Sequence, residues 1–466
     1  MQNNVHLSPA EMEKQREITN KIKLSLGDGP RFALVETFGC QQNVNDSQRI
    51  QGMLMEMGYT LTEDRKEADV IIFNTCAVRE NAEARVFGNL GALKALKSKK
   101  PGLIIGVCGC MIQQEHIAKR IKSKYRHVDM IFGTHTLWKF PELMENALEH
   151  SERVYDISGS GVIAEGIPVN YDGGRKAFVS VMYGCNNFCS YCIVPYVRGR
   201  ERSRLREDIL KEIQCLAESG VCEVMLLGQN VNSYGKDRGE EDAFAALLRD
   251  VCKIDGIERI RFMSSHPKDI SPVLLHTMAE EPKICNQLHL PLQSGSTRVL
   301  SEMNRVYTRE KYLEIIKLAK ELMPDITLTT DIIVGFPTET EEDFLETLSI
   351  LKEVGYDSIF SFIYSKREGT KAALMENVAT EEEIDNRFKR LLDVQNAVSL
   401  ERNRRHEGKI EKVLVEGESK NDLGMLTGRT EGNKIVNFKG DKALTGTFAD
   451  VKITKAQTWV LCGEQA

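Results

Sequence analysis

The sequence predicts an α/β protein with three folded parts: an N-terminal doubly wound parallel sheet, a central partial (β/α)6 barrel and a C-terminal small β-barrel. Three observations support this prediction. Short apolar runs alternate with charged, helix-periodic stretches over residues 31–150, the same alternation resumes near residue 177, and roughly the last sixty residues change to short segments separated by glycines. A chain of 466 residues is too long for one ordinary domain, and its hydrophobic content of 41% can fill several cores.

The first part is predicted to begin with a helical extension over residues 1–30, which mixes acidic and basic side chains and lacks the pattern of a targeting segment. Four apolar runs then predict parallel strands, because each is followed by a stretch of helical periodicity. These runs are Phe32–Val35, Val70–Phe73, Leu103–Val107 and Val128–Phe132.

Three cysteines follow three of these predicted strands. Cys40, Cys76 and Cys110 each lie just past the end of a different strand. Ligands of parallel sheets gather beyond the carboxyl ends of the strands, so these thiols can converge on one edge. A lone cysteine is most often a small core residue, and we expect this of Cys108. Glycine and asparagine beside the other three suit turns and close backbone approach. The pattern thus favours a three-thiolate site, and scattered structural cysteines are the alternative.

A Gly-rich, polar stretch over residues 151–176 predicts a linker between two domains. Six strand candidates follow, each paired with a helical stretch, and a full barrel of this kind needs eight, so we expect a barrel that is open at one side. The candidates are Phe178–Met182, Glu223–Leu227, Arg259–Met263, Gln287–Leu290, Ile326–Val334 and Ser358–Tyr364.

The loop after the first of these strands carries three more cysteines. Cys185, Cys189 and Cys192 have the spacing C-x3-C-x2-C. Cubane iron–sulfur clusters are usually held by four cysteines, so a loop that offers three leaves one iron open to another ligand. Zinc is the alternative, since paired thiolates also bind it. Zinc knuckles usually need a fourth ligand nearby, and the next cysteine, Cys215, lies in a predicted helix. The spacing favours the cluster.

Polar side chains at the same end of the predicted barrel are candidates for lining a pocket. Gln293 follows the fourth strand and Asp331 lies on the fifth. Each alone is more typical of packing or hydrogen bonding. We nevertheless expect that, among the polar residues at this end, Gln293 and Asp331 are the leading candidates to bind a cofactor.

The C-terminal part, residues 403–466, has short segments broken by glycines, which are typical of a small β-barrel. Such barrels often bind RNA, but the basic residues here are balanced by acidic ones, so composition favours a generic β-module. Phe438 could stack on a base, or it could fill the barrel core.

The overall charge and cysteine content limit the partners and the compartment. The net charge is −6 and the pI about 6.0, which argues against a uniformly basic coat for nucleic acid. Twelve cysteines are too few for a disulfide scaffold, so we expect a reducing, cytoplasmic compartment. The sequence has no run of about eighteen apolar residues, so we expect no membrane partner, and we expect a monomer.

Several motifs together resemble the radical S-adenosylmethionine (SAM) methylthiotransferase family over nearly the whole chain. They are the triple-cysteine loop with an aromatic residue before its last cysteine, and the stretches Thr37–Ser47, Pro195–Gly199 and Ser265–His266–Pro267. The last three resemble the members that modify N6-isopentenyladenosine at position 37 of tRNA. Gln42 departs from the methionine that these enzymes often carry there, which leaves the thiol count unchanged.

The resemblance implies two [4Fe-4S] clusters and two SAM molecules, one as the methyl donor and one as the source of a 5'-deoxyadenosyl radical. The first three cysteines would bind an auxiliary cluster, and the later three the SAM-cleaving cluster, in a radical SAM domain over residues 177–402. Tyr191 would place backbone groups near the adenine of SAM, and Gly335 matches the glycine motif of the fifth strand. The C-terminal part would be a TRAM domain. Reduced flavodoxin or ferredoxin would donate the electron.

The resemblance leaves two further questions open. The arginines of the run Arg198–Arg204 could bind RNA phosphate or the carboxylate of SAM, or could form an ordinary solvated face. The function also has alternatives. One is a methylthiotransferase for threonylcarbamoyladenosine in tRNA or for a ribosomal-protein aspartate, and the other is a non-enzymatic zinc-binding RNA module.

Overall fold

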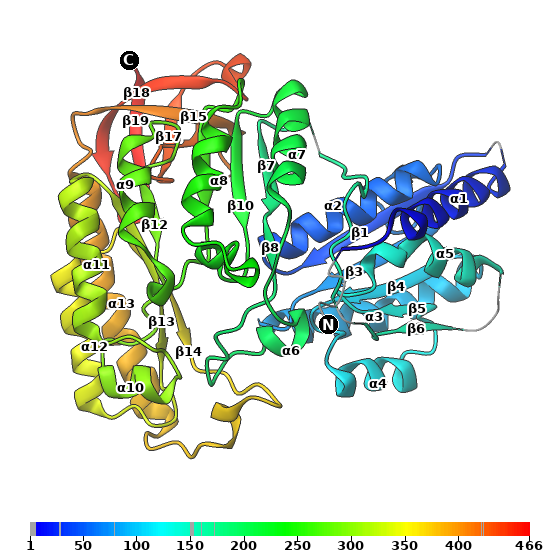
Figure 1. The fold of residues 1–466 in the computed structure, drawn as a ribbon, viewed down its shortest axis with the longest axis horizontal. Coiled ribbons are helices and arrows are strands. Elements are labelled where there is room, and N and C mark those ends of the chain that lie inside the picture. The colour runs from blue at the N-terminus through cyan, green and yellow to red at the C-terminus, as the bar shows by residue number, and fades with distance from the viewer. Residues whose placement is uncertain are drawn as a thin grey trace. The chain divides into compact units, whose positions relative to one another are not determined.

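The computed structural model divides the chain into two compact units (Figure 1). The first consists of residues 1–172, 178–186 and 193–208, and the second of residues 173–177, 187–192 and 209–466. The structure describes residues 6–27, 29–78, 80–149, 153–159, 161–171, 173–420, 422 and 424–466, without the side chains of residues 80–82. The predicted extension 1–30 and the predicted linker 151–176 therefore lie partly outside the described residues, and the predicted domain boundaries stay predictions.

A six-stranded parallel sheet forms the centre of the first unit, in the order β2-β1-β3-β4-β5-β6. The strands are β1 (Phe32–Phe38), β2 (Thr60–Leu61), β3 (Val70–Thr75), β4 (Ile104–Gly109), β5 (Met130–Phe132) and β6 (Val154–Asp156). The sequence predicted four of them and missed β2 and β6, because strands of two and three residues are too short to show a pattern.

Helices cover both faces of this sheet (Figure 1). They are α1 (Pro9–Ser25), α2 (Gln41–Glu56), α3 (Glu80–Lys99), α4 (Glu115–Lys124) and α5 (Phe140–Glu149). Successive strand residues point to opposite faces, so Ile72 packs with α1, α2 and α5, whereas Ile71 packs with α3 and α4. Cys108 is buried in the first of these two cores, as predicted. The doubly wound fold predicted for this part is thereby confirmed.

The first unit also holds the chain on either side of the triple-cysteine loop. The short strands β8 (Met182–Tyr183) and β9 (Arg202–Ser203) pair in antiparallel fashion, and α6 (Val194–Arg198) lies between them in the sequence.

The second unit contains the strands of the partial barrel. The sheets have the orders β11-β10-β7 and β12-β13-β14, and one parallel bridge between Ile260 and Ile284 links β11 to the segment before β12. The strands are β7 (Lys176–Ser180), of which residues 176 and 177 belong to this unit, β10 (Glu223–Leu227), β11 (Arg259–Phe262), β12 (Gln287–His289), β13 (Thr327–Val334) and β14 (Ser358–Ile363). All six predicted strands are present.

The helices of this part follow the strands in turn. They are α7 (Arg206–Glu218), α8 (Ala243–Cys252), α9 (Pro272–Glu280), α10 (Thr297–Glu302), α11 (Arg309–Leu322), α12 (Glu341–Val354) and α13 (Glu381–Arg404). Short 3-10 turns occur at Leu137–Lys139 in the first unit and at Val231–Ser233, Lys236–Arg238, Pro267–Asp269, Lys371–Leu374 and Lys442–Leu444 in the second. No helix of the described residues is long and apolar enough to cross a membrane.

Five strands close a small barrel at the C-terminus, in the order β15-β16-β17-β19-β18. They are β15 (Ile410–Glu418), β16 (Leu426–Arg429), β17 (Ile435–Lys439), β18 (Phe448–Ala456) and β19 (Val460–Gln465). Phe438 is fully buried in the core of this barrel and therefore cannot be a stacking platform for a base.

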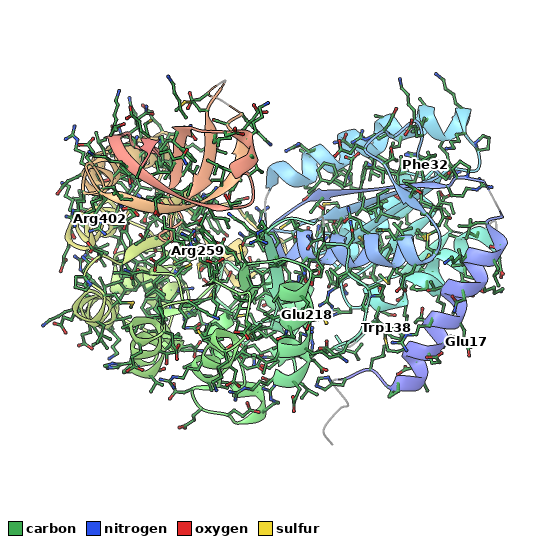
Figure 2. All side chains as sticks on the ribbon, turned by 90° about the horizontal axis from the view of Figure 1, so that it is seen from above. Glu17, Phe32, Trp138, Glu218, Arg259 and Arg402 are labelled. Atoms are coloured by element: carbon green, nitrogen blue, oxygen red, sulfur yellow. The ribbon has the colours of Figure 1, made fainter. Side chains whose placement is uncertain are left out.

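Buried cations fasten this small barrel to the rest of the second unit. Arg259 donates to the carbonyls of Lys412 and Arg429 at 2.6 and 3.0 Å, and Lys434 pairs with Asp357 at 2.8 Å. Arg402 of α13 pairs with the same aspartate at 3.1 Å (Figure 2). Charge-assisted bonds that lie away from water are stronger than exposed ones, so they fix the barrel on α13 and on the ends of β11 and β14.

Candidate metal centres

Three adjacent strands of the first unit end level with one another, and a cysteine follows each of them closely. The registers pair Phe38 of β1 with Thr75 of β3, and Thr75 with Gly109 of β4. Cys40, Cys76 and Cys110 come one or two residues later. The level ends are the reason that three cysteines distant in sequence meet at one edge of the sheet.

Gly109 directs the chain into the last of these turns. Its φ is +98°, a conformation that glycine adopts without the steric cost of a side chain. A Cβ atom at this position would lie 2.4 Å from both the Asn74 Oδ1 and the Thr75 carbonyl oxygen. The adjacent strand thus approaches too closely for any other residue, and this close approach positions Cys110 beside Cys76.

Cys40, Cys76 and Cys110 form a candidate site, called the auxiliary site below. Two buried asparagines, Asn43 and Asn74, connect the turns that carry these cysteines. Asn43 Oδ1 accepts a hydrogen bond from the Cys40 backbone N–H at 3.3 Å. Asn43 Nδ2 donates to Asn74 Oδ1 at 3.0 Å and to the Thr75 carbonyl at 3.3 Å, and Asn74 Nδ2 donates back to the Asn43 carbonyl at 2.8 Å. Both side chains are almost fully buried. Such a network makes the positions of the cysteines depend on the folded sheet.

The thiols of this site influence one another. The pKa of Cys40 is lowered to about 5, first by a hydrogen bond from Cys76 and then, against the effect of burial, by the charge of Arg198. The same hydrogen bond raises the pKa of Cys76. Burial raises the pKa of Cys110, and Arg198 opposes that rise. Cys40 is therefore the first of the three to become a thiolate, the form that binds metal.

Arg198 lies against this site. Its Nε donates to Cys110 Sγ at 3.0 Å, and its Nη2 donates to Asp46 Oδ2 at 2.6 Å. The exposed fraction of Arg198 is 5% and that of Asp46 is 6%. Although burial, the largest influence, lowers the pKa of Arg198, the charges of Asp46 and Cys110 raise it well above its ordinary value. The guanidinium is thus a permanent charge beside the thiols.

The donor set fits a cubane cluster. Three thiols with one anionic member and an adjacent guanidinium provide the soft ligands and the charge balance that an iron–sulfur cluster needs. Among the described residues, no group of three or more His, Cys, Asp or Glu side chains is arranged to hold a metal ion. A single ion needs its ligands to converge on one point, whereas a cubane offers a different iron to each thiolate.

The triple-cysteine loop is organised differently. Cys185 belongs to the first unit, where its backbone N–H donates to the Gly199 carbonyl at 3.1 Å. Cys189 and Cys192 belong to the second unit, where the Cys192 N–H donates to the Cys189 carbonyl at 2.9 Å. The covalent spacing of the loop, rather than a shared core, keeps the three cysteines near one another.

Arg305 lies beside this loop within the second unit. Its Nη1 is 3.8 Å from Cys189 Sγ and 3.4 Å from the Tyr191 hydroxyl. Its Nε donates to the Tyr307 hydroxyl at 2.7 Å, and its Nη2 donates to the Pro291 carbonyl at 2.5 Å. No sequence pattern singled out this arginine, since it meets the loop from more than a hundred residues away.

The predicted cofactor-binding residues lie in the second unit: Tyr191 in the triple-cysteine loop, Asp331 within β13, and Gln293 and Gly335 just after strands. Gln293 has a φ of +73°, and its backbone pairs with β13, donating to the Asp331 carbonyl at 2.8 Å. Asp331 Oδ1 lies 3.5 Å from His289 Nε2. The ring of Tyr191 packs on a core that contains Ile333, two residues after Asp331. The structure thus gathers three of the four at one end of the barrel, and their contact with SAM stays a prediction.

Gly335 is the fourth predicted cofactor-binding residue, and the backbone at this position requires glycine. Its φ is +72°, and a Cβ atom there would lie 2.8 Å from Ile384 Cγ2. Its N–H donates to Glu339 Oε2 at 2.7 Å. Burial, the largest influence, raises the pKa of Glu339 to about 7. The sequence analysis did not identify Glu339. Its position four residues after Gly335 is the sequence feature that could have pointed to it.

Two of the arginines in the run after the loop, Arg198 and Arg204, are buried. Arg204 is 2% exposed, and its Nη2 pairs with Glu165 at 2.6 Å, while Arg198 pairs with Asp46. Arg202 donates to the carbonyls of Arg198 and Arg200. Arg200 is exposed. Because Arg198 and Arg204 form buried ion pairs, their charges stabilise the fold. These two arginines therefore do not belong to a solvated face, which was one interpretation of the run.

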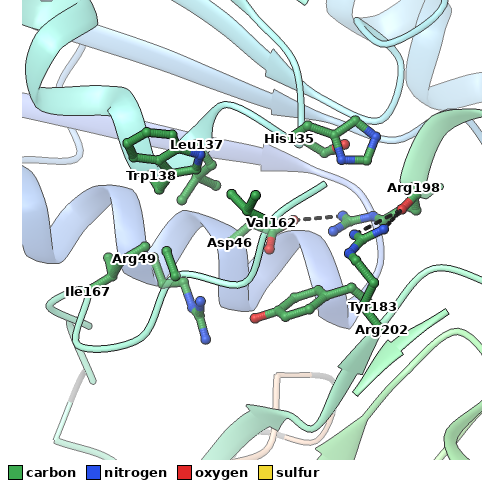
Figure 3. Close-up of a pocket in the computed structure, with 12 residues that line it drawn as sticks. Asp46, Arg49, His135, Leu137, Trp138, Val162, Ile167, Tyr183, Arg198 and Arg202 are labelled. Carbon is green, nitrogen blue, oxygen red and sulfur yellow. Dashed lines mark hydrogen bonds and ion pairs between the residues drawn. The ribbon is translucent and has the colours of Figure 1, made fainter. Parts of the chain in front are cut away.

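A cavity in the first unit borders the auxiliary site (Figure 3). Its lining includes Asp46, Arg49, His135, Arg198 and Arg202, and a dashed line in Figure 3 marks the ion pair of Asp46 with Arg198. Burial, and after it the charges of Arg202 and Arg198, lower the pKa of His135 to about 4. The imidazole is therefore neutral at physiological pH.

Three segments of the chain match known families. Residues 33–133 match the Uncharacterized protein family UPF0004, residues 179–351 match the Radical SAM superfamily, and residues 404–465 match the TRAM domain.

Among solved structures, the fold is similar to that of TsrM from Kitasatospora setae, a radical S-adenosylmethionine methyltransferase. The TM-score is 0.54 at 13% identity, over 74% of this chain and 75% of that chain. At this identity the likeness concerns the fold alone.

Curated relatives match over nearly the full length. The tRNA-2-methylthio-N(6)-dimethylallyladenosine synthase of Acetivibrio thermocellus is 53% identical over 99% of this chain and 97% of its own length. The enzyme of the same name from Clostridium tetani is 55% identical over 92% of this chain and 95% of its own. With this identity and coverage, the chain belongs to the tRNA-2-methylthio-N(6)-dimethylallyladenosine synthase family of radical SAM methylthiotransferases.

Proposed function

We propose that the chain adds a methylthio group to C2 of N6-dimethylallyladenosine, also called N6-isopentenyladenosine, at position 37 of tRNA. It is an enzyme of the radical SAM class, and its cofactors are [4Fe-4S] clusters and SAM. Relatives at 50 to 55% identity carry this activity in their names. The observation that best supports the proposal within the fold is the meeting of Cys40, Cys76 and Cys110 at one sheet edge, in addition to the separate C-x3-C-x2-C loop.

The target carbon explains why this chemistry needs two cysteine sets. The C2 carbon of adenine is neither nucleophilic nor easily deprotonated, so side chains acting as acids and bases gain little there. A low-potential cluster that cleaves SAM supplies the radical chemistry that proteins otherwise lack. One SAM would serve as the methyl donor and a second as the source of the 5'-deoxyadenosyl radical.

The residues of the chain would divide this work. Cys40, Cys76 and Cys110 would hold the auxiliary cluster, with the low pKa of Cys40 supplying a thiolate at neutral pH. Cys185, Cys189 and Cys192 would hold the SAM-cleaving cluster. Three residues near one end of the partial barrel, Tyr191, Gln293 and Asp331, would orient SAM together with Gly335.

The proposal also covers the electron donor, the oligomeric state, the cellular compartment and the domain division. Reductive cleavage of SAM needs a potential near the low end of the cluster range, about −700 to +450 mV, so a reduced flavodoxin or ferredoxin is the fitting electron donor. We also propose that the chain acts as a monomer in the cytoplasm. The proposed domain division is 31–150, 177–402 and 403–466, which overlaps the three family matches.

Nucleoside mass spectrometry of tRNA from cells that lack the gene tests the substrate. We expect the 2-methylthio form to disappear and N6-isopentenyladenosine to accumulate. Restoring the wild-type gene should restore the product, and Cys108→Ala should restore it too, because Cys108 is a buried core residue and is not one of the proposed ligands. Unchanged tRNA modification would favour the alternative substrates, threonylcarbamoyladenosine or a ribosomal-protein aspartate.

Anaerobic reconstitution tests the class of protein. Two cubane clusters require about eight irons with matching sulfide per chain. Stoichiometric zinc, with no SAM cleavage under dithionite, would instead identify a structural zinc-binding RNA module.

A further inference from the structure

Arg198 connects the proposed auxiliary site to the segment that follows the triple-cysteine loop. It is the last residue of α6, which begins two residues after Cys192. Val197 of the same helix and Ile193, which immediately precedes the helix, pack against Cys110 and Ala77 in one small buried cluster. The guanidinium thus reaches Cys110 from a helix that is itself seated on the auxiliary site.

The hydrogen bond from Arg198 to Cys110 is held in place by a second layer of contacts. Asp46 accepts from Arg198 Nη2 at 2.6 Å and from Gln42 Nε2 at 3.3 Å. Gln42 Nε2 donates to Ser180 Oγ at 2.8 Å, and Ser180 Oγ donates to Asn45 Oδ1 at the same distance. Each residue of this chain of contacts is at least nine-tenths buried. A guanidinium with its planar fork fixed in this way has little freedom to leave the sulfur.

A buried cation bonded to a cysteine sulfur has a physical consequence for a cluster held there. It stabilises the more negative of two cluster oxidation states, since added charge on the cluster spreads onto its sulfur ligands. The effect grows as water is excluded.

We propose that Arg198, oriented by Asp46, is a positioning residue that holds the Cys110 corner of the auxiliary cluster and raises the reduction potential of that cluster. This inference rests on the proposed function, because it needs a cluster at Cys40, Cys76 and Cys110. Arg198 acts through Cys110 and does not touch the tRNA or SAM in this role.

The test measures the auxiliary cluster alone. In a Cys189→Ala background the SAM-cleaving cluster is removed, and anaerobic reconstitution should leave about four irons per chain. The midpoint potential is then followed by electron paramagnetic resonance during a redox titration. Adding Arg198→Met, which keeps an unbranched side chain reaching about as far as Nε and removes the charge and the donors, should shift the midpoint to a more negative value and change the spectrum.

Matched variants separate the role of Arg198 from general disturbance. Arg198→Lys keeps a charge and should recover part of the shift. Arg200→Met removes an exposed arginine two residues away and should leave midpoint and spectrum unchanged. Asp46→Asn keeps the guanidinium and removes the carboxylate that offsets its charge, so it should move the midpoint in the opposite direction from Arg198→Met, to a less negative value.

The outcomes distinguish the two proposals. If the Cys189→Ala protein binds no iron, the proposed auxiliary site is wrong. If it binds four irons and Arg198→Met retains them with an unchanged midpoint and spectrum, the inference about Arg198 is overturned while the proposed function stands. If Arg198→Met stays folded by circular dichroism but loses the cluster, Arg198 is needed to hold the Cys110 corner, and Asp46→Asn then decides the effect on the potential.

Discussion

The two cysteine sets of this molecule are built in opposite ways. Cys40, Cys76 and Cys110 are spread over seventy residues and come together because three neighbouring strands end in register. Cys185, Cys189 and Cys192 lie within eight residues of sequence, and the two compact units divide this loop between them. The first set therefore depends on the folded sheet, and the second depends on covalent spacing and on its local supports.

Each set also has a buried arginine, and the two arginines differ in strength of contact. Arg198 Nε lies 3.0 Å from Cys110 Sγ and is balanced by a carboxylate, Asp46. Arg305 Nη1 lies 3.8 Å from Cys189 Sγ and is held by a phenol and a carbonyl, those of Tyr307 and Pro291. The shorter bond stands beside the thiols that would hold the auxiliary cluster. The longer contact brings less positive charge onto the sulfur of the loop, in keeping with the low potential that SAM cleavage needs.

Removing a ligand of the loop should have the largest effect. We expect Cys189→Ala to abolish SAM cleavage and all methylthio product, since a cluster held by two thiolates is lost from the loop. The auxiliary site should keep about four irons, because its cysteines depend on the sheet of the first unit. The checks are 5'-deoxyadenosine formation by chromatography and iron analysis. Loss of all iron from a folded variant would show that the proposed auxiliary site is wrong.

Removing a ligand of the auxiliary site should be more selective. We expect Cys76→Ala to keep SAM cleavage and to lose the methylthio product, because the proposed ligands of the SAM-cleaving cluster lie in the other set. The measurement is 5'-deoxyadenosine together with modified tRNA nucleoside, with Cys108→Ala as a control that changes a neighbouring core cysteine. If Cys76→Ala remained folded and cleaved no SAM, the division of roles between the two sets would be wrong.

A change that removes no thiol should test the dependence on the sheet. In Gly109→Ala, a Cβ atom at a φ of +98° would meet Asn74 and Thr75 at 2.4 Å. Strain of this kind costs on the order of 2–4 kcal/mol, so we expect the turn to shift and the auxiliary iron to fall, with SAM cleavage largely retained.

Two further alanines make this test specific. Gly88 lies on α3 in the same unit, and among the described residues a Cβ atom there would have no neighbouring atom within 4 Å. Gly88→Ala should therefore leave the iron content unchanged and should not lower the stability. Gly184→Ala is the counterpart at the loop, where a Cβ atom would clash with the Arg200 carbonyl next to Cys185. It should reduce SAM cleavage and spare the auxiliary iron. The opposite pattern in either variant would contradict the comparison.

The sequence could single out the cysteines as candidates because their signals are local. A cysteine just past an apolar strand, or three within one loop, can be recognised from order and spacing alone. The arginines could not be found in this way, since the bond of Arg198 to Cys110 spans 88 residues and that of Arg305 to Cys189 spans 116. Nothing in a run of arginines tells which of them turns inward, and here Arg198 and Arg204 do.

The fold shows the same limit. The long strands were predicted because burial on both faces gives continuous apolar runs, as in β3 and β4. The edge strands β2 and β6 are two and three residues long and partly exposed, so they carry no such run. The register that levels Phe38, Thr75 and Gly109 is a property of the assembled sheet. It determines the site and has no counterpart in the sequence of any single strand.

The smallest effect we predict concerns pH and compares the two units. Each holds a histidine whose pKa burial lowers, to about 4 for His135 in the first unit and to about 2 for His266 in the second. An unfolded histidine has a pKa near 6.5, so below that pH the unfolded chain takes up protons that the folded chain refuses. Stability contributed by each neutral histidine is full above pH 6.5 and falls as the pH drops, down to about 4 and about 2 respectively.

Tryptophan fluorescence can follow the first unit separately. Trp138 lines the same cavity as His135, and Trp459 lies in the second unit, so Trp459→Phe leaves a single reporter in the full chain. Between pH 7 and pH 5, the free energy of unfolding seen by Trp138 should fall by at most about 2 kcal/mol through His135, since one pKa unit is about 1.4 kcal/mol. His135→Asn should remove that part of the fall, and His266→Asn should not. An equal fall with and without His135 would show that its imidazole is protonated in the folded state, and that the positive field of Arg198 and Arg202 is weaker than their positions imply.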